Sequence, residues 1–133
     1  MPFTKKWLLK DQVNYIKFTD RVTLQDIEQL SEAHQVWTRQ MATNILGHCI
    51  VDATDVLDYP KKIRSIKNHL NGRITHTEWL IFIADDYYLN HMVNIFAQLF
   101  HFKVKIVASF QEATLFLQDA TGIQCHDDKS ACV

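Results

Sequence analysis

The chain has 133 residues, of which 47% are hydrophobic and 22% are charged. This composition is typical of one globular domain rather than of a disordered segment. Its 14 basic and 15 acidic residues give a formal net charge of −1, so overall charge gives no reason to expect a nucleic acid or an anionic membrane as a partner. The three glycines lie far apart, at positions 47, 72 and 122, which excludes the glycine-rich phosphate-binding loops of the common nucleotide enzymes.

The sequence also predicts where the protein is found. No apolar run approaches the roughly 20 residues of a membrane-spanning helix, and no apolar signal region follows the lysines near the start. Three cysteines are too few and odd in number for a disulfide scaffold. We therefore expect a cytoplasmic protein with no membrane insertion.

The first third of the chain predicts a hairpin followed by a helix. Residues 7–10 and 13–18 read as two short strands separated by two residues, which is the spacing of a β-hairpin. A helix is expected from Thr23, because Thr23 and Asp26 form a pair like a capping box. Apolar residues then recur at spacings of three and four along residues 24–41.

The middle of the chain predicts a strand, a loop and a second helix. The strand is expected over residues 48–53, after an exit loop that holds Gly47. A loop is expected over residues 55–60. Pro60 is expected in the first turn of the following helix, where its missing N–H costs nothing, and Asp58 is the expected cap.

The last third predicts two further strand–helix pairs. Residues 79–84 are continuously apolar, as expected for a parallel strand covered on both faces. Asp86 and its neighbour Asp85 are expected to cap a helix over residues 87–100. A strand near the sheet edge is expected over residues 104–108, followed by a helix that Ser109 opens with a capping box.

Together these elements predict an α/β fold in a single domain over residues 1–120. A mixed sheet opens with the antiparallel hairpin and continues with alternating parallel strands and helices, which pack on the sheet. Residues 121–133 are polar and read as a C-terminal tail.

Five aspartates are expected near one edge of this sheet: Asp52, Asp55, Asp58, Asp85 and Asp86. Such a group would suit Mg²⁺, as in phosphotransfer receivers. Aspartate is, however, most often a helix cap or a turn residue, and we favour that interpretation. The seven histidines form no metal-binding pair, and no nucleophile motif is present. We predict no metal, no cofactor and no catalytic residue.

Several segments resemble a known family. The stretches at residues 49–56, 79–84 and 104–113, together with the element order, look like a STAS domain. That fold is shared by anti-sigma-factor antagonists and the cytosolic tails of sulfate transporters. The resemblance covers roughly residues 7–120 and implies a STAS-like scaffold.

The chain departs from that family at its regulatory switch. The family carries a phosphorylated serine in an Asp-Ser-Ser-Gly-like turn, where phosphorylation adds about two negative charges to a partner-binding surface. The matching stretch here is Leu57-Asp58-Tyr59-Pro60-Lys61, which lacks the serine and the glycine. The resemblance therefore implies the scaffold without this switch.

We predict a non-enzymatic regulatory module that binds another protein and no nucleic acid. Its contact surface should combine the locally basic stretch after residue 60 with the tyrosines that follow the aspartate pair. The predicted contact residues are Asp55, Asp58, Tyr59, Lys61, Lys62, Arg64, Ser65, Asp85, Asp86, Tyr87 and Tyr88.

Other interpretations stay open at this point. One is a small-molecule domain that binds an anion or a lipid, or an unrecognised enzyme, which would need a pocket of roughly 300 Å³ or more. Phe96, Phe100, Phe102 and Phe116 are candidates to line such a pocket. A receiver-like phosphotransfer domain ranks third. Homodimerisation through the hairpin edge is also open.

Overall fold

The computed structural model describes residues 3–9, 12–40, 47–62, 64–66, 77–100 and 103–123, apart from the side chains of residues 34–40, 77 and 100. None of the helices in these residues is both long enough and apolar enough to cross a membrane. The predicted C-terminal tail beyond residue 123 and the predicted end of the second helix near residue 72 lie outside the described residues.

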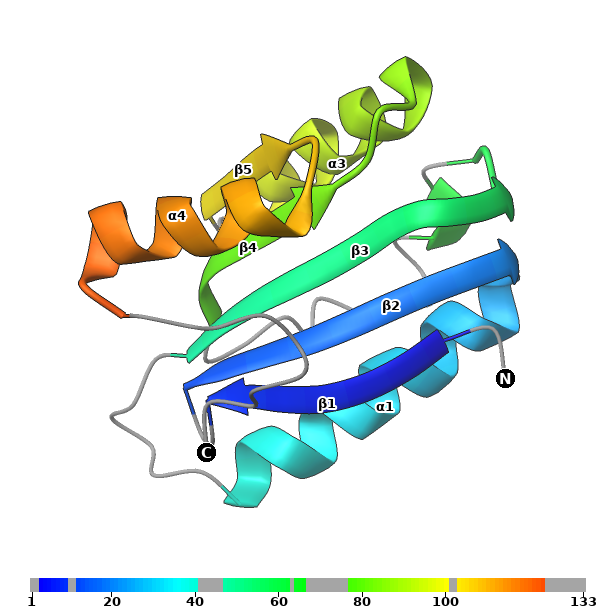
Figure 1. Ribbon diagram of the computed structural model, residues 1–133. Helices are drawn as coiled ribbons and strands as arrows, with labels where there is room; N and C mark the ends of the chain where they lie inside the picture. Colours follow the sequence, from blue (N-terminus) through cyan, green and yellow to red (C-terminus); the bar gives the residue numbers. More distant parts are fainter. Residues whose placement is uncertain are drawn as a thin grey trace.

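The described chain alternates strands and helices, as the sequence predicts (Figure 1). In chain order the elements are β1 (Phe3–Leu9), β2 (Val13–Arg21), α1 (Leu24–Gln40), β3 (Gly47–Asp58), β4 (Thr77–Ile83), α3 (Tyr87–Phe100), β5 (Lys103–Val107) and α4 (Phe110–Thr121). Residues 64–66 form a further helical segment.

The five strands form one mixed sheet in the order β1-β2-β3-β4-β5. β1 runs antiparallel to β2, which confirms the opening hairpin, and every later pair is parallel. The hairpin strands are longer than expected, since β1 starts at Phe3 and β2 ends at Arg21. β5 lies at the edge with Lys103 and Lys105 exposed, as predicted.

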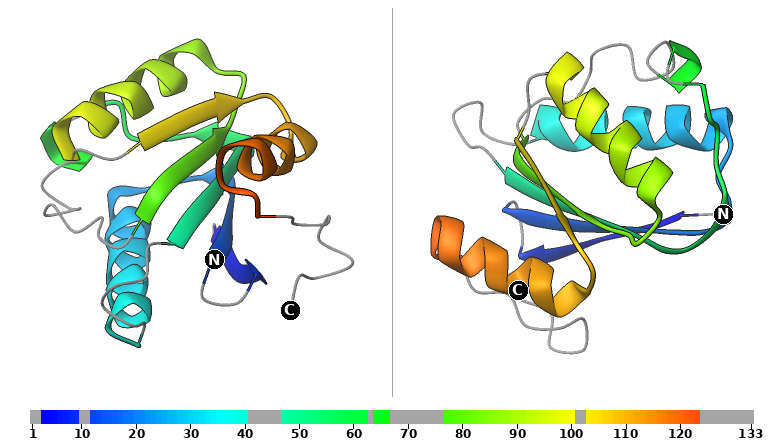
Figure 2. Two further views of the ribbon diagram at one scale, coloured as in Figure 1. Left: turned by 90° about the vertical axis from the view of Figure 1, so that its left-hand side faces the viewer. Right: turned by 90° about the horizontal axis from the view of Figure 1, so that it is seen from above.

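Helices cover both faces of the sheet (Figure 2). α1 and α3 lie on one face and α4 lies on the other. β3 supplies both cores, because successive side chains of a strand point to opposite faces. Ile50 packs in the cluster that contains Leu117 of α4, whereas Cys49 and Val51 pack in the cluster on the α1 side. β4 is likewise covered on both faces, as its apolar run predicts: Ile81 and Ile83 are buried in the α4 core, and Leu80 and Phe82 are half-buried on the other face.

Local caps begin the helices where the sequence predicts. The Thr23 N–H donates to the Asp26 carboxylate at 2.8 Å, and the Asp26 N–H donates to the Thr23 hydroxyl at 3.2 Å, which completes a capping box. Ser109 caps α4 by accepting from the Glu112 N–H. Gly122 ends α4 at a φ of +79°, a left-handed conformation that glycine adopts without strain.

The prediction of a loop over residues 55–60 is wrong, because β3 continues to Asp58. The long β2 provides the reason. Thr19 pairs with Asp55 and Arg21 with Asp58, after a register shift that follows the pairing of Lys17 with Asp52. Gly47 is the first residue of β3 and not part of an exit loop.

The helix expected to begin around Pro60 also starts later. Tyr59 to Lys62 are not helical, and helical structure is first seen at residues 64–66. Lys61 folds back instead: its ammonium donates to the Asp58 carboxylate at 3.1 Å and to the Tyr59 carbonyl at 2.9 Å. Asp58 accepts from the N–H of Tyr59 and caps none of the helical residues that the structure describes.

A buried carboxylate stabilises the irregular part of β3. Asp52 lies on the α4 face, where it accepts hydrogen bonds from the Tyr15 hydroxyl at 2.6 Å and from the Thr54 N–H and hydroxyl at 3.0 and 2.7 Å. Burial by itself would raise the pKa of Asp52, but these hydrogen bonds and the nearby Lys17 outweigh it and lower the pKa.

We expect Asp52→Asn to lower the free energy of unfolding by about 1–3 kcal/mol at pH 7. This is the size of the contribution that hydrogen bonds to a charged group make to stability. A lowered pKa stabilises the fold above the unfolded value of about 3.9, and this contribution is lost as the pH falls through the folded pKa. The difference in the free energy of unfolding between the wild type and Asp52→Asn should therefore become smaller below pH 4. Urea unfolding from pH 7 to pH 3 measures it.

The exposed carboxylate of Asp85 provides the matched control. Asp85→Asn should change the free energy of unfolding by less than about 0.5 kcal/mol at either pH, because exposed substitutions rarely cost more. An Asp52→Asn deficit that is constant from pH 7 to pH 3 would contradict the stabilising role of the Asp52 charge.

Candidate functional site

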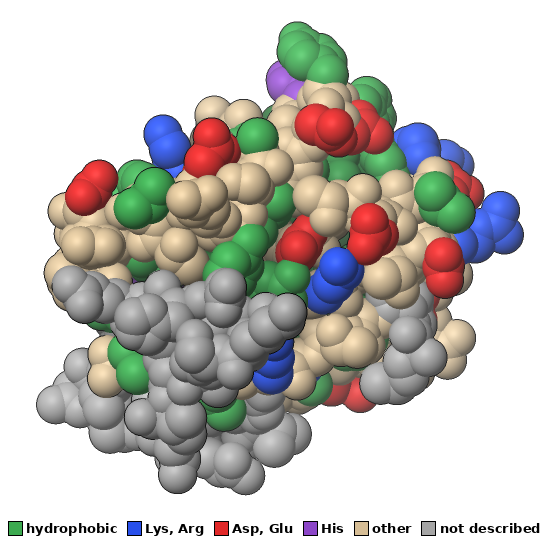
Figure 3. All heavy atoms as spheres, in the orientation of Figure 1, with side chains coloured by type: hydrophobic (Ala, Val, Ile, Leu, Met, Phe, Trp, Pro, Cys, Tyr) green, Lys and Arg blue, Asp and Glu red, His purple; other side chains and the backbone are tan. Residues whose placement is uncertain are grey.

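Most of the predicted contact residues lie where β2 and β3 end and α3 begins. We call residues 57–62, Arg64 and residues 85–88 the strand-end surface. Acidic, basic and hydrophobic side chains gather together at this end of the molecule, on the right of Figure 3. The chain reaches this edge because β3 runs four residues past Thr54, in register with the end of β2.

Asp86 joins the two parts of the strand-end surface. One carboxylate oxygen accepts from the backbone N–H groups of Tyr88 and Leu89, at 2.9 and 3.2 Å. This arrangement caps α3, as the sequence predicts for Asp86. The other oxygen accepts from the Tyr59 hydroxyl at 3.1 Å, which ties the end of β3 to the start of α3.

Lys61 lies at the centre of a small charged cluster. Its ammonium is 3.7 Å from the centre of the Tyr59 ring, a cation–π contact, and 3.1 Å from the Asp58 carboxylate. Arg21 lies 3.4 Å from the other oxygen of Asp58. Hydrogen bonds from Lys61 and from the Tyr59 N–H lower the pKa of Asp58, so this carboxylate stays ionised.

The two tyrosines of the surface are also connected. The Tyr88 hydroxyl donates to the Lys61 carbonyl at 3.1 Å, and the Tyr59 and Tyr88 rings lie 6.4 Å apart between centres. Partial burial and then the hydrogen bond to Asp86 raise the pKa of Tyr59 to about 12. Tyr59 is therefore a neutral hydrogen-bond donor at any physiological pH.

Large apolar side chains point outward around this cluster. Tyr87 is 87% exposed, Leu57 is 83% exposed and Tyr88 is 46% exposed. Lys62 and Arg64 are exposed as well. Leu57 is not among the contact residues predicted from the sequence. No local signal distinguishes it from its apolar neighbour Val56, which lines the interior.

The structure does not bring all the predicted residues together. Asp55 pairs with Lys17 at 3.0 Å. Lys17 shares a strand face with Tyr15, which packs on Phe110 of α4, so this pair lies on the opposite side of the sheet from Tyr59. Ser65 is half-buried rather than exposed. Two further basic residues of the stretch after residue 60, Lys67 and Arg73, lie outside the described residues.

The five aspartates that would suit Mg²⁺ are separated. Asp52 lies in the middle of β3 and not at a strand end, and Asp55, Asp58 and Asp86 have the partners given above. Within the described parts of the chain, no three His, Cys, Asp or Glu side chains are grouped so that they could hold a metal ion.

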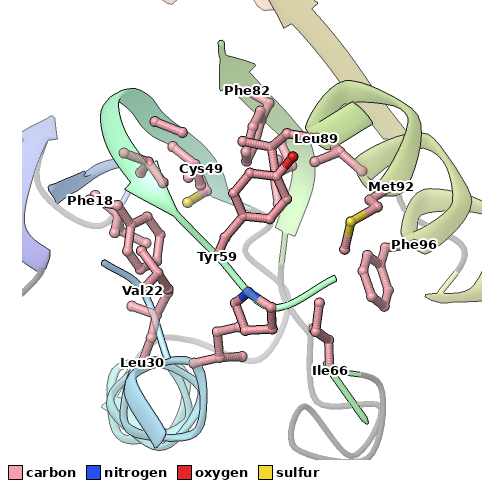
Figure 4. Close-up of a pocket in the computed structure, with 18 of the residues that line it drawn as sticks. Phe18, Val22, Leu30, Cys49, Tyr59, Ile66, Phe82, Leu89, Met92 and Phe96 are labelled. Carbon is pink, nitrogen blue, oxygen red and sulfur yellow. The ribbon is translucent and has the colours of Figure 1, made fainter. Parts of the chain in front are cut away.

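A cavity of about 230 Å³, partly open to solvent, lies on the α1 and α3 face of the sheet (Figure 4). The sheet contributes Cys49, Val51 and Phe82 to its lining, and Tyr59 and Pro60 lie along it. α1 supplies Ile27 and Leu30, and α3 supplies Met92 and Phe96. Ile66 packs against Met92 and Phe96. None of the described residues that line it is charged.

Of the four phenylalanines proposed for a pocket, Phe96 lines this cavity. Phe116 lies on the other face, where its ring contacts Trp79 at 4.8 Å between centres. The side chain of Phe100 and all of Phe102 lie outside the described residues. The cavity draws on residues from Ile16 to Phe96, so no local motif could have indicated it.

Comparisons with known proteins match this architecture at the level of fold. An uncharacterized protein of the DUF3478 family with a SpoIIAA-like fold, from Shewanella loihica, aligns with a TM-score of 0.61 and 12% sequence identity. The alignment covers 86% of this chain and 91% of that chain. No protein-family model matches the chain, and no curated protein matches it by sequence. The chain thus has the SpoIIAA-like fold, which is the STAS fold, as the sequence resemblance implies.

The capping role of Asp86 can be tested by measuring the stability of variants. Asp86→Ala should lower the free energy of unfolding by about 1 kcal/mol, because α3 loses its N-cap. Asp86→Asn should cost less than about half of that, since asparagine caps helices nearly as well as aspartate. Thermal unfolding of both variants measures the difference. Equal costs for the two variants would contradict a capping role.

Proposed function

We propose that this chain is a non-enzymatic, cytoplasmic regulatory module of the STAS fold that binds another protein through the strand-end surface. The carrying observation is the exposure of Leu57 and Tyr87, at 83% and 87%, on a surface that internal hydrogen bonds hold in place. Exposed apolar groups that are clustered and rimmed by polar side chains mark interaction sites.

The polar groups of the surface support binding rather than catalysis. Asp58 is engaged by Lys61, and Asp86 is engaged by the N-terminus of α3 and by Tyr59. These carboxylates therefore maintain the shape of the surface. A surface whose side chains are already ordered loses less conformational entropy when a partner binds.

The side chains also indicate the chemistry of the partner. Tyr87 and Tyr88 offer aromatic area at low entropic cost, and tyrosine is enriched among the residues that dominate binding energy. Lys62 and Arg64 add positive charge at the rim. The expected partner presents an apolar recess bordered by acidic side chains, which would steer association electrostatically.

A quantitative pull-down with the tagged full chain tests this proposal. Leu57→Asp should reduce recovery of the specific partner from a lysate of the source organism at least about tenfold, the effect of losing roughly 1.4 kcal/mol of binding energy. The double variant Lys62→Glu/Arg64→Glu should also reduce recovery of the partner. This reduction should be larger at low salt than at high salt, because salt screens exposed charges. Direct titration with the purified partner must reproduce both effects.

Leu115 of α4 provides the matched control, because it is an exposed leucine (53%) on another part of the molecule. Leu115→Asp should recover the partner as well as the wild type does. The proposal is contradicted if Leu57→Asp recovers every captured protein as well as the wild type does. Light scattering of the purified chain shows whether the partner is a second copy.

A second candidate function is the binding of a small apolar molecule in the cavity beside the same surface. The observation that favours it is the uncharged, apolar lining. The volume of about 230 Å³ is below the roughly 300–1,000 Å³ of sites for drug-sized ligands. The cavity therefore falls short of the roughly 300 Å³ that this interpretation was expected to need, which counts against it for all but compact molecules.

A further inference from the structure

The edge strand β5 pairs with β4 on one side, and none of the described strands pairs with its outer side (Figure 1). The Val107 carbonyl accepts from the Ala84 N–H, so the backbone groups of Val107 point towards β4. Backbone groups alternate in direction along a strand, and those of Val104 and Ile106 therefore point away from the sheet. These N–H and C=O groups are the ones that an added strand would use.

Both lysines of β5 are positioned on the α4 face of this edge. The Lys103 ammonium lies 5.4 Å from the centre of the Trp79 ring, and the Lys105 ammonium lies 5.6 Å from the centre of the Phe116 ring. The two rings contact each other edge to face, so they form one aromatic base under both lysines. Residues two apart along a strand share a face and are roughly 7 Å apart. The edge thus presents two positive charges at the spacing of alternate strand residues.

Neither of these lysines is neutralised by a described carboxylate. Lys17, Arg21 and Lys61 each lie within 3.4 Å of an aspartate oxygen. Lys103 and Lys105, by contrast, are exposed and have no carboxylate within ion-pair distance in the described part of the chain. Their charge is therefore available to an acidic partner.

The other face of β5 is apolar and incompletely covered. Val104 and Ile106 point to the face that carries α3, and both are only half-buried. Leu99, near the end of the same α3 helix that packs on β5, is 44% exposed. Apolar side chains on the matching face of an added strand would remove part of this apolar surface from water.

The charges of the edge indicate which partner fits it. Two β5 strands paired antiparallel would place lysine against lysine on the α4 face, and like charges opposite each other destabilise a sheet. A nucleic acid would be attracted by the same charges, but Trp79 and Phe116 are half-buried with a lysine over each, which disfavours base stacking. A peptide strand with acidic side chains at alternate positions matches both the lysines and the outward backbone groups.

We propose that β5 is a docking edge for an extended acidic peptide segment of another protein, which adds to the five-stranded sheet beside β5. Its alternate carboxylates pair with Lys103 and Lys105, and its intervening apolar side chains lie against Val104 and Ile106. Its backbone bonds to the outward N–H and C=O groups of the same two apolar residues. None of these residues belongs to the strand-end surface, so the inference goes beyond the function proposed for that surface and does not depend on it.

Titration of the full-length chain, followed by backbone-amide NMR, tests the docking edge with two capped heptapeptides of four glutamates and three valines. Glutamate and valine alternate in the first peptide, whereas all glutamates precede the valines in the second, so composition and charge are identical. The alternating peptide should bind at least about fivefold more tightly, because only it places its carboxylates on one face. It should shift the amide signals of Val104 and Ile106 and leave those of β1 unchanged.

Several outcomes of this titration overturn the proposal. They are the absence of saturable binding, equal affinity for the two peptides, and amide shifts confined to segments other than β5. An oligodeoxythymidylate that binds more tightly than the alternating peptide also overturns it, in favour of a nucleic-acid site.

A charge reversal on β5 tests the role of the lysines. Lys105→Glu should weaken binding of the alternating peptide at least about fivefold at low salt and less at high salt, because an attraction becomes a repulsion that salt screens. Lys6→Glu is the matched control and should bind as the wild type does. Lys6 is also an exposed lysine, 5.4 Å from the centre of the Tyr15 ring, but it lies on the opposite edge strand. Equal affinity of Lys105→Glu and Lys6→Glu overturns the proposal.

A proline substitution tests whether the peptide adds as a strand. Val104→Pro removes an outward N–H and no hydrogen bond to β4, which is a change that edge strands tolerate. It should bind the alternating peptide at least about threefold more weakly than Val104→Ala, which keeps the N–H. Amide spectra show that each variant is folded before it is titrated, and the Lys105→Glu comparison does not depend on this pair. Equal affinity of folded Val104→Pro and Val104→Ala overturns strand addition.

Discussion

The architecture depends on β3, which pairs with a parallel strand along each edge and is covered on each face. Its first seven residues, from Gly47 to Ala53, are all buried. Because side chains alternate, Ile50 joins the α4 core while Cys49 and Val51 join the α1 and α3 core. A one-residue slip would exchange these sets, so the register of β3 is strongly specified by burial. The position at which β3 ends then determines where Tyr59 meets α3.

The parts of the fold that were predicted from sequence carry local signals. The apolar run of β4, the Thr23–Asp26 box and the Ser109 cap each lie within a few residues, and the structure confirms them. The extension of β3 carries no such signal. Asp55 and Asp58 are typical turn residues, yet pairing with the long β2 and contacts with Lys17 and Arg21 keep them in a strand. Tertiary pairing here overrides local preference.

The candidate site likewise has a part that the sequence predicted and a part that only the structure shows. The sequence placed Tyr59, Lys61 and Tyr88 in one predicted surface because strand ends and helix starts share a sheet edge. The bond between Tyr59 and Asp86 joins residues 27 apart, and only the structure reveals it. The cavity was beyond sequence reasoning, because its lining comes from both long helices and three strands. Asp55 was misplaced because the register shift of β3 turns it toward Lys17.

The central claim is that residues 57–62 and 85–88 act as one contact surface, and hydrogen exchange of the complex tests it most directly. Mass spectrometry of the chain with its purified partner should show slower exchange in both segments together, while α4 exchanges as in the free chain. Protection confined to α4 or to β1, with both segments of the strand-end surface unchanged, would contradict the account.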